Sequence, residues 1–550
     1  MCEPNPTTNE NKVQASKFKN IKDNILFGPE YPISREPVNI AKIILKTLKS
    51  KPEFIGQIDA LTGKQNTYAE MSERSIKCAL WLKKQGVKAG DMIALCTDNN
   101  LDAIIILLGI MYLNGKCNIW DHKLSLTRAR YYLSLISPTI IFTIPLSAAN
   151  LTEAAKELKM DVKIVVLGKI DGYESLDNIL RGHDNREIAE FNCTPISNLN
   201  EVGLICLSSG TTGMPKATEL SHVSMYNRVF PAKVYEMNGH ICLFLPTLRW
   251  HYGILFAFAA IQKYFTTILV NINVNDENRC SKYCSFIERY RVTFFGSTPH
   301  ILSQLVKTDV LEKYRLPTLK VITSGGSTFS KQQQEALKKK IPNVLIFNSY
   351  GSTDAGCAVA IQNKYSKLGS VGFPASNVQI KITDTKTESV LGVNKVGEIR
   401  VKTPFVMNGY YKNPEATKKA FDSDGWLCTG DLGYYDHDGE LFVVSRISDF
   451  ILFRTFNVLP MEIETVLQDH PAVFEAVVIG MPHEDDGQRP MAVVSVVPGK
   501  TVTEQELIEL VEKSLPDYCR LRAGIKFIDK LPRTLTGKIA KGQLQSMFTN

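Results

Sequence analysis

The stretch LSSGTTGMPK at residues 207–216 places serine and threonine hydroxyls, two glycines and a lysine within ten residues. It follows an apolar run at residues 202–207, which is typical of a buried strand. Backbone N–H groups of such small residues can approach an anion closely, and Lys216 can neutralise phosphate charge. The spacing is not that of a Walker A loop. The stretch therefore predicts a loop that binds a polyphosphate, with an ordinary surface turn as the alternative.

Two further motifs precede this loop in the sequence, and several others follow it. They are TYAE at 67–70, GD at 90–91, SGGS at 324–327, NSYGSTD at 348–354, GEI at 397–399, NGYY at 408–411, GWLCTGD at 425–431, Arg446 and LTGK at 535–538. In this order they resemble the adenylate-forming superfamily, which includes acyl-CoA synthetases, 4-coumarate–CoA ligases and insect luciferases. The resemblance covers about residues 57–543, most of the chain.

The predicted architecture is α/β. Short β-branched runs alternate with helical patterns, which indicates α/β layers with largely parallel sheets, and closer-spaced strands at residues 371–401 indicate a β meander. About 100 residues after Arg446 suffice for a separate α+β domain. The resemblance implies the same division into a large N-terminal domain and a small mobile C-terminal lid. We expect a disordered tail at residues 1–25, an adenylation domain at 26–446 and the lid at 447–550.

Bulk properties narrow the class of protein. The net charge of +8 over 550 residues suits anionic ligands but is no signature of nucleic-acid binding. The twelve cysteines form no C-x-x-C pair, which favours reduced thiols over zinc. The apolar run at residues 104–110 is too short to span a membrane and predicts a core helix. With no secretory signal and no S-K-L-type C-terminus, we expect a cytoplasmic protein, although the family also includes peroxisomal members.

The reaction that the resemblance implies joins a carboxylate to ATP, giving acyl-adenylate and pyrophosphate, before transfer of the acyl group to CoA. Two anions meet in the first step, so catalysis depends on positioning and charge neutralisation. No G-x-S-x-G motif suggests a serine nucleophile instead. The expected partners are a small carboxylate, ATP, Mg²⁺ and CoA, and the sequence does not give the oligomeric state.

By matched position, the resemblance implies two sets of nucleotide contacts. The β- and γ-phosphate contacts are Ser209, Gly210, Thr211, Thr212, Gly213 and Lys216. The contacts around the adenine are Gly325, Gly326, Ser327, Asn348, Ser349, Tyr350 and Gly351.

The resemblance also implies the residues nearest the chemistry. Thr353 contacts the α-phosphate, and Asp354 holds Mg²⁺, a hard cation suited to a carboxylate. Asp431 and Arg446 bind the ribose. Lys538 on the lid neutralises charge at the α-phosphate and the incoming carboxylate, so catalysis requires lid closure. Ordinary structural roles are the alternatives: an Asx turn for Asp431 and a solvated charge for Lys538. Tyr350 could be a core ring, and Thr353 a strand-end threonine.

The substrate pocket is predicted at Trp250, His251 and Tyr252. Trp250 stands about where many ligases and luciferases have a histidine, and its bulk suggests a pocket reshaped for another acyl group. His251 is a candidate substitute, although a lone histidine beside aromatic residues is more often structural.

Other departures from the family pattern affect the metal site and the second half-reaction. Asp354 replaces the usual glutamate, one methylene longer, and Ala217 replaces a glycine. Ser448 replaces the hinge lysine and Thr455 a glycine beside the pantetheine tunnel, where a β-branched residue narrows the passage. Leu452 stands where beetle luciferases carry a lysine.

Three functions remain open from the sequence. The first is an ATP-dependent acyl-CoA synthetase for an apolar, fatty or aromatic carboxylate. The second is a luciferase-like monooxygenase that adenylates a luciferin and oxidises it with O₂. The third, a binding protein without turnover, is disfavoured because Lys216, Asp431 and Lys538 are all present.

Overall fold

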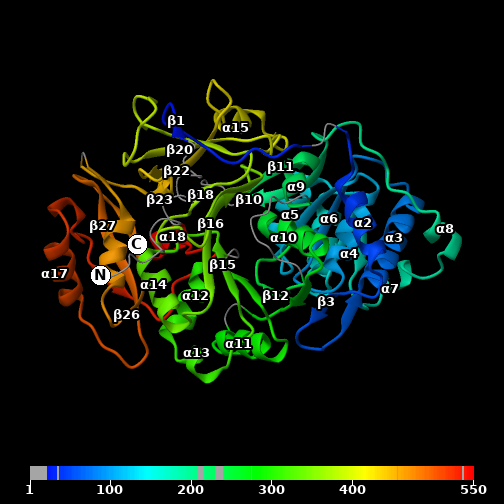
Figure 1. The fold of residues 1–550 in the computed structure, drawn as a ribbon, viewed down its shortest axis with the longest axis horizontal. Coiled ribbons are helices and arrows are strands. Elements are labelled where there is room, and N and C mark those ends of the chain that lie inside the picture. Colours follow the sequence, from blue (N-terminus) through cyan, green and yellow to red (C-terminus); the bar gives the residue numbers. More distant parts are fainter. Residues whose placement is uncertain are drawn as a thin grey trace, which may run out of the picture.

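Two sheets with mostly parallel strands form the centre of the N-terminal part (Figure 1). The computed structural model describes residues 21–33, 36–208, 215–229, 239–273, 276–454, 456–534 and 538–549. The strands of the first sheet run in the order β21-β11-β10-β6-β5-β7-β8-β9, and those of the second in the order β18-β17-β16-β15-β14-β12-β13-β3-β4. Their central pairs are parallel and antiparallel pairs occur at the edges, so the predicted α/β layers are confirmed.

The strands of the first sheet are β5 (Met92–Cys96), β6 (Lys116–Trp120), β7 (Ile140–Thr143), β8 (Lys163–Val166), β9 (Glu174–Ser175), β10 (Val202–Ser208), β11 (Lys216–Ser221) and β21 (Gly409–Tyr410). Those of the second are β3 (Ile55–Asp59), β4 (Gln65–Thr67), β12 (Ile241–Phe244), β13 (Thr266–Leu269), β14 (Phe294–Ser297), β15 (Val321–Gly325), β16 (Leu345–Ser352), β17 (Cys357–Ile361) and β18 (Phe373–Pro374).

Helices connect and cover these strands, as parallel crossovers require. They are α2 (Ile40–Ser50), α3 (Tyr68–Lys84), α4 (Ala103–Tyr112), α5 (Leu126–Ile136), α6 (Pro145–Glu157), α7 (Leu176–Ile179), α8 (Asn185–Ala189), α9 (His222–Val229), α10 (His251–Gln262), α11 (Arg279–Arg289), α12 (Pro299–Lys307), α13 (Val310–Lys313), α14 (Lys331–Lys340) and α15 (Pro414–Lys419). Helix α4 is apolar on all sides and fully buried, so the predicted core helix is confirmed. The TYAE motif begins α3 as a capping box between Thr67 and Glu70.

An antiparallel sheet of six strands lies beside these layers and contains the predicted meander. Its order is β1 (Ile21–Lys22), β2 (Ile25–Phe27), β19 (Gln379–Thr383), β20 (Gly397–Lys402), β22 (Leu427–Tyr435) and β23 (Leu441–Arg446). Residues 21–25, which we assigned to the tail, instead lie in β1 and at the start of β2. They are ordered because β2 pairs with β19 and Leu26 enters the core. Residues 1–20 lie outside the described residues.

The C-terminal part is a smaller α+β unit, orange to red in Figure 1. A short 3-10 turn at Ile447–Asp449 follows β23. The sheet then contains β24 (Ile451–Phe453), β25 (Phe456–Val458), β26 (Val473–His483), β27 (Gly487–Val496) and β28 (Ile525–Phe527), with helices α16 (Pro460–Gln468), α17 (Glu504–Ser514) and α18 (Lys541–Phe548). From α16 to β28 the order is helix, strand, strand, helix, strand, so this unit is an α+β unit as expected. No helix in the ranges that the structure describes is long and apolar enough to cross a membrane.

Gly356 is a position where the fold near the site tolerates no side chain. Its φ is +66°, and a Cβ there would lie 1.8 Å from the Phe405 carbonyl oxygen. We expect Gly356→Ala to destabilise the N-terminal part by about 3 kcal/mol, because backbone strain adds to overpacking. Gly425 is the matched control, since its φ is +77° but a Cβ meets nothing within 4 Å. Urea denaturation measures both variants, and equal midpoints for Gly356→Ala and Gly425→Ala would contradict the packing argument.

Candidate active site

The carboxyl ends of two adjacent parallel strands bring together the motifs predicted to frame the adenine. β15 ends in Ser324 and Gly325, and the register of β15 on β16 places them opposite Asn348 and Ser349. The Ser349 hydroxyl donates to the Ser324 carbonyl at 3.1 Å. Segments 324–327 and 348–351 therefore form one edge, as expected for a ligand site at strand ends of an α/β sheet.

The predicted substrate residues lie against this edge. A Cβ on Gly326 would stand 3.0 Å from the Trp250 ring, and one on Gly325 would stand 4.0 Å from the Tyr252 ring. Trp250 and Tyr252 therefore line the same site as the glycine turn. His251 begins α10 and is buried, which agrees with a structural role as well as with a pocket role.

Asp431 is a buried carboxylate at the meeting point of three strands. Tyr350 on β16 donates its hydroxyl to Asp431 Oδ2 at 2.7 Å, and Arg446 Nε lies 2.9 Å from Oδ1. Arg446 is the cross-strand partner of Asp431 on β23. The charge of Asp431 raises the pKa of Arg446, and burial raises the pKa of Tyr350. Each carboxylate oxygen keeps a lone pair, so Asp431 can also accept hydrogen bonds from ribose hydroxyls.

Asp354 follows β16 and is held by two donors that sequence reasoning missed. Tyr410 donates its hydroxyl to Asp354 Oδ2 at 2.6 Å, and Thr218 donates to Oδ1 at 3.0 Å. The pairing of β11 with β21 places these two donors opposite each other. The Lys216 ammonium lies 4.7 Å from the centre of the Tyr410 ring. The NGYY motif contained the signal for Tyr410, but only the fold shows which carboxylate it contacts.

These contacts fit a Mg²⁺ ion that takes most of its ligands from a nucleotide. Each oxygen of Asp354 accepts one hydrogen bond and keeps a lone pair for a metal. Mg²⁺ is often held by one or two carboxylates together with substrate phosphates. No group of three or more His, Cys, Asp or Glu side chains able to hold a metal occurs among the described residues. Thr353 adjoins Asp354, and its carbonyl accepts from the Gly356 N–H at 3.0 Å.

Lys538 reaches the N-terminal site from the C-terminal part. The Thr534 N–H donates to the Lys538 carbonyl at 2.7 Å, and Arg533 and Ile539 form an isolated antiparallel bridge. The Lys538 side chain is exposed, but the protein atoms around it still desolvate its ammonium group. This desolvation lowers the pKa of Lys538, and the charge of Arg446 lowers it further. Asp431 and Asp449 act in the opposite direction. The lysine predicted to act at the α-phosphate therefore lies near the predicted ribose residues.

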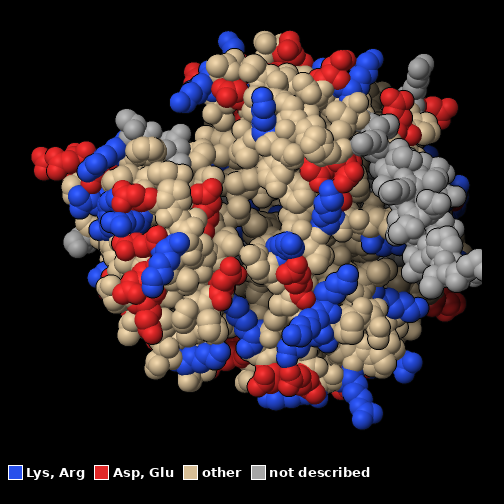
Figure 2. All heavy atoms as spheres, turned by 60° about the vertical axis from the view of Figure 1, so that its left-hand side comes forward, with Lys and Arg blue, Asp and Glu red and all other residues tan. Residues whose placement is uncertain are grey.

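Several predicted residues lie outside the described part of the chain. They are Ser209, Gly210, Thr211, Thr212, Gly213, Thr455 and the first three residues of the LTGK motif. Figure 2 shows a hollow near the centre of the face that it displays. Acidic and basic side chains are interspersed around this hollow.

The comparisons with known proteins agree with this geometry. A model of the AMP-binding enzyme family matches residues 46–411, and a model of the AMP-binding enzyme C-terminal domain matches residues 462–538. The chain belongs to the adenylate-forming, AMP-binding enzyme family. The resemblance seen in the motifs and the mixed α/β fold with a large N-terminal and a smaller C-terminal part are thereby confirmed.

Relatives in this ATP-binding family differ in activity. Luciferin 4-monooxygenase of Luciola mingrelica is 31% identical over 532 residues, which cover 94% of this chain and 96% of the relative. Probable 4-coumarate–CoA ligase 1 of Dictyostelium discoideum is 27% identical, covering 96% and 98%. The crystal structure of ATP-bound MatB from Rhodopseudomonas palustris superposes with a TM-score of 0.82 at 24% identity, covering 93% and 99%. The family is established, whereas the roles of individual residues stay predictions.

A chain of polar contacts joins the C-terminal part to α11 and α12. Arg279 Nη2 lies 2.8 Å from His300 Nε2, so a neutral His300 carries its proton on Nδ1 and donates it to Glu475 Oε1 at 2.8 Å. Arg533 Nη2 lies 2.5 Å from the same oxygen. Lys307 adds bonds to the carbonyls of residues 473 and 474 on β26. These contacts fix the C-terminal part in the position that brings Lys538 to the site.

The metal prediction concerns Tyr410. We expect Tyr410→Phe to raise the Mg²⁺ concentration for half-maximal pyrophosphate release by roughly tenfold, because Asp354 loses one of its two donors while Lys216 keeps its aromatic neighbour. Electron paramagnetic resonance of Mn²⁺ with ATP gives a readout that does not depend on turnover. Tyr411→Phe on the same segment is the control. A Mn²⁺ affinity equal to that of the unaltered protein would show that Tyr410 does not position the metal ligand.

The pH prediction concerns Glu475 and His300. Burial raises the pKa of Glu475, but the bond from His300 and the charge of Arg533 outweigh it and bring the pKa to about 2. Burial also lowers the pKa of His300 below its usual 6.5. In both cases the unfolded or undocked chain binds more protons at low pH. Docking is therefore strongest near neutrality and weakens as pH falls, first below 6.5 through His300 and then between about 4.5 and 2 through Glu475.

Limited proteolysis between the two parts, followed over pH, measures this docking. In Glu475→Gln the lower step is expected to disappear, because the residue no longer titrates. Cleavage that stays independent of pH in the unaltered protein would refute the assignment.

Proposed function

We propose that the protein is an ATP-dependent acyl-CoA synthetase that activates an apolar, fatty or aromatic carboxylate as acyl-AMP and transfers it to CoA. The observation that carries the proposal is Lys538, a cation from the C-terminal part that lies near Asp431 and Arg446 of the N-terminal part. A cation at the junction of ribose, α-phosphate and carboxylate is what acyl-adenylate formation needs. The relatives include both ligases and luciferases, so the adenylation step is the shared element.

In this proposal the chain's own residues orient and neutralise the reactants. Asp431 and Arg446 hold the ribose, and the glycine edge at 324–327 holds the adenine. Lys216 neutralises the departing phosphates. Lys538 offsets the charge of the carboxylate oxygen as it attacks the α-phosphorus and of the pyrophosphate as the P–O bond breaks. Asp354 would hold Mg²⁺, which would supply further charge neutralisation at the phosphate oxygens.

We also propose a domain division after Arg446, with the described residues up to 446, β1 and β2 included, as the adenylation domain and residues 447–550 as a lid that turns about a hinge after Arg446. Such a lid excludes water during adenylation and opens for the second step. The hinge segment Ile447–Asp449 is a single 3-10 turn, so few backbone contacts resist rotation.

The CoA step depends on the hairpin β24–β25. Leu452 and Phe456 are about half exposed on it, at 51% and 48%, and Phe456 stacks on Tyr518 with ring centres 4.9 Å apart. Arg454 at the tip has a φ of +54° and is tied to Asp486 at 2.6 Å. Exposed apolar side chains on the lid suit a second ligand that binds after the lid has turned.

A luciferin monooxygenase is the second candidate, supported by the 31% identity to the Luciola enzyme. Product analysis with ATP, Mg²⁺ and a panel of fatty and aromatic acids, with and without CoA and with photon counting, separates the candidates. Thioester formed only with CoA supports the synthetase. Light with a luciferin supports the monooxygenase, and ATP binding without pyrophosphate release from any acid would contradict both.

The lid lysine gives the next prediction. We expect Lys538→Ala to lower the rate of acyl-AMP formation by about a hundredfold or more and to leave ATP affinity nearly unchanged, because the side chain acts mainly in the transition state. Lys513→Ala is the control, since this lid lysine is 76% exposed and pairs with Glu509 in the same helix, α17. Single-turnover acyl-AMP formation and ATP titration measure the two effects. Unchanged adenylate formation in Lys538→Ala would overturn the assignment.

The tunnel residue gives a separate prediction. If Thr455 narrows the path of pantetheine, Thr455→Gly raises the rate of thioester formation, because glycine removes the β-branched side chain, and leaves pyrophosphate release unaltered. The two products are measured in the same reaction. An equal loss of both would show that Thr455 stabilises the lid instead.

A further inference from the structure

Two phenylalanine rings form a tight pair beside the predicted acyl site. Phe244 ends β12 and Phe256 lies on α10, and their rings are stacked with centres 3.7 Å apart and planes 4° from parallel. Phe256 also stacks on Phe294 at 5.6 Å. A Cβ on Gly296 would stand 2.0 Å from Phe244, so this ring lies directly on the backbone of β14. The pair is therefore packed against β14, Phe244 on its backbone and Phe256 on the Phe294 ring.

On one side, the pair continues the wall of the site already described. The Tyr252 ring lies edge-on to Phe244, with ring centres 5.1 Å apart. Tyr252 in turn faces Gly325 of the adenine edge. Tyr252 and Phe256 are four residues apart on α10 and thus share one helix face. Phe244 therefore lies one ring beyond Tyr252 from the adenine edge.

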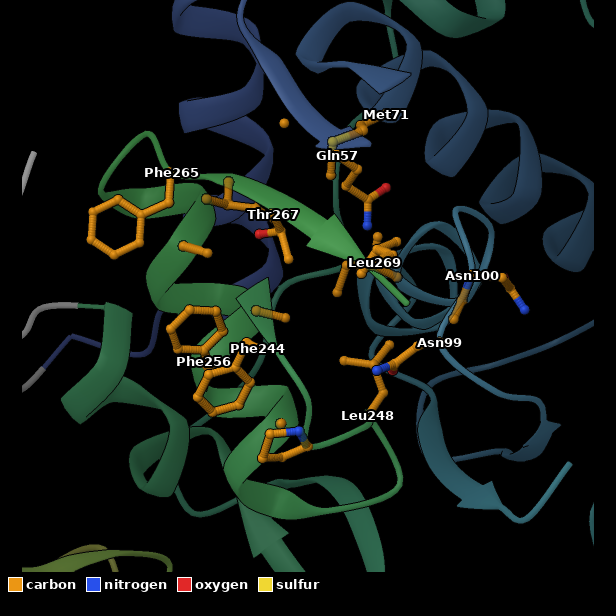
Figure 3. A pocket seen from close by; sticks show the side chains of 18 residues that line it. Gln57, Met71, Asn99, Asn100, Phe244, Leu248, Phe256, Phe265, Thr267 and Leu269 are labelled. Carbon is orange, nitrogen blue, oxygen red and sulfur yellow. The ribbon is translucent and has the colours of Figure 1, made fainter. Parts of the chain in front are cut away.

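The pair also lines a pocket (Figure 3). Its walls come from α10, α4, α3, β13, β3 and the segment after β12. They include the apolar side chains of Met71, Leu248, Ala257, Ile261 and Leu269 and the polar side chains of Gln57, Asn99, Asn100 and Thr267. Figure 3 shows Phe244 and Phe256 together at one end of it, across from Leu248 and Asn99. The pair therefore contacts Tyr252 through Phe244 and also lines the pocket.

We propose that the Phe244–Phe256 pair is the specificity-determining wall of the acyl site. The wall ends the site just beyond Tyr252, so the protein activates compact carboxylates, either aromatic or short-chain, and excludes the tail of a long-chain acid. Removing the Phe256 ring would open this pocket, with its apolar side chains, toward such a tail. This inference rests on the proposed adenylation of a carboxylate and narrows its substrate class.

The test compares cinnamic, hexanoic and dodecanoic acids by pyrophosphate release. In the unaltered protein kcat/KM is expected to be highest for the compact acids. Phe256→Ala joins the pocket to the site and is expected to raise kcat/KM for dodecanoic acid, relative to hexanoic acid, by about tenfold or more. Ala257→Leu fills the pocket without touching the site, so alone it leaves compact acids unaffected, and combined with Phe256→Ala it cancels the gain.

Several outcomes would overturn the inference. They are a preference of the unaltered protein for dodecanoic acid, no gain in Phe256→Ala, or a gain that survives Ala257→Leu. Phe256→Leu retains more of the packing and replaces Phe256→Ala if the latter unfolds, as judged by its melting temperature.

If no acid releases pyrophosphate, the proposed function fails. The wall is then judged by binding of a fluorescent dodecanoic acid, which Phe256→Ala should bind and the unaltered protein should not.

Discussion

The rest of the site depends on the pairing of the buried Asp431 carboxylate with Arg446 and Tyr350. A charge removed from water is costly unless it is paired and hydrogen-bonded, and Asp431 meets this need with Arg446 at 2.9 Å and the Tyr350 hydroxyl at 2.7 Å. These partners belong to β23 and β16, so one residue joins the antiparallel sheet to the parallel one. Arg446 is also the last residue before the turn into the C-terminal part. The same ion pair thus anchors the predicted ribose site and the start of the predicted hinge.

The position of the C-terminal part follows from a second, partly buried carboxylate. Glu475 accepts from His300 and Arg533, and Lys307 binds the same strand. Lys538 is thereby held near Asp431, in an arrangement suited to adenylation. Because the contacts named here are polar, they can be released and reformed, as a two-step reaction with a moving lid requires.

Much of the fold and many of the candidate residues could be predicted from local sequence patterns. The contacts between residues far apart in the sequence could not. The helix at Lys331–Lys340, the buried helix α4 and the alternation of strands and helices follow from periodicity and capping along the chain. The motifs gave the family and the candidate residues. Tyr410 and Thr218 lie 56 and 136 residues from Asp354, and His300 lies 175 residues from Glu475, so no local pattern reveals these pairs. The strands at residues 21–27 were missed because they gain order only by pairing with β19.

The central claim is that this chain forms an acyl-adenylate reversibly with its lid closed. Exchange of labelled pyrophosphate into ATP tests it most directly, because the exchange reports adenylation alone and needs neither CoA nor oxygen. The account predicts exchange that appears only when a carboxylate is added. Exchange that needs no carboxylate, or hydrolysis of ATP to ADP and phosphate with no exchange from any acid, would contradict it.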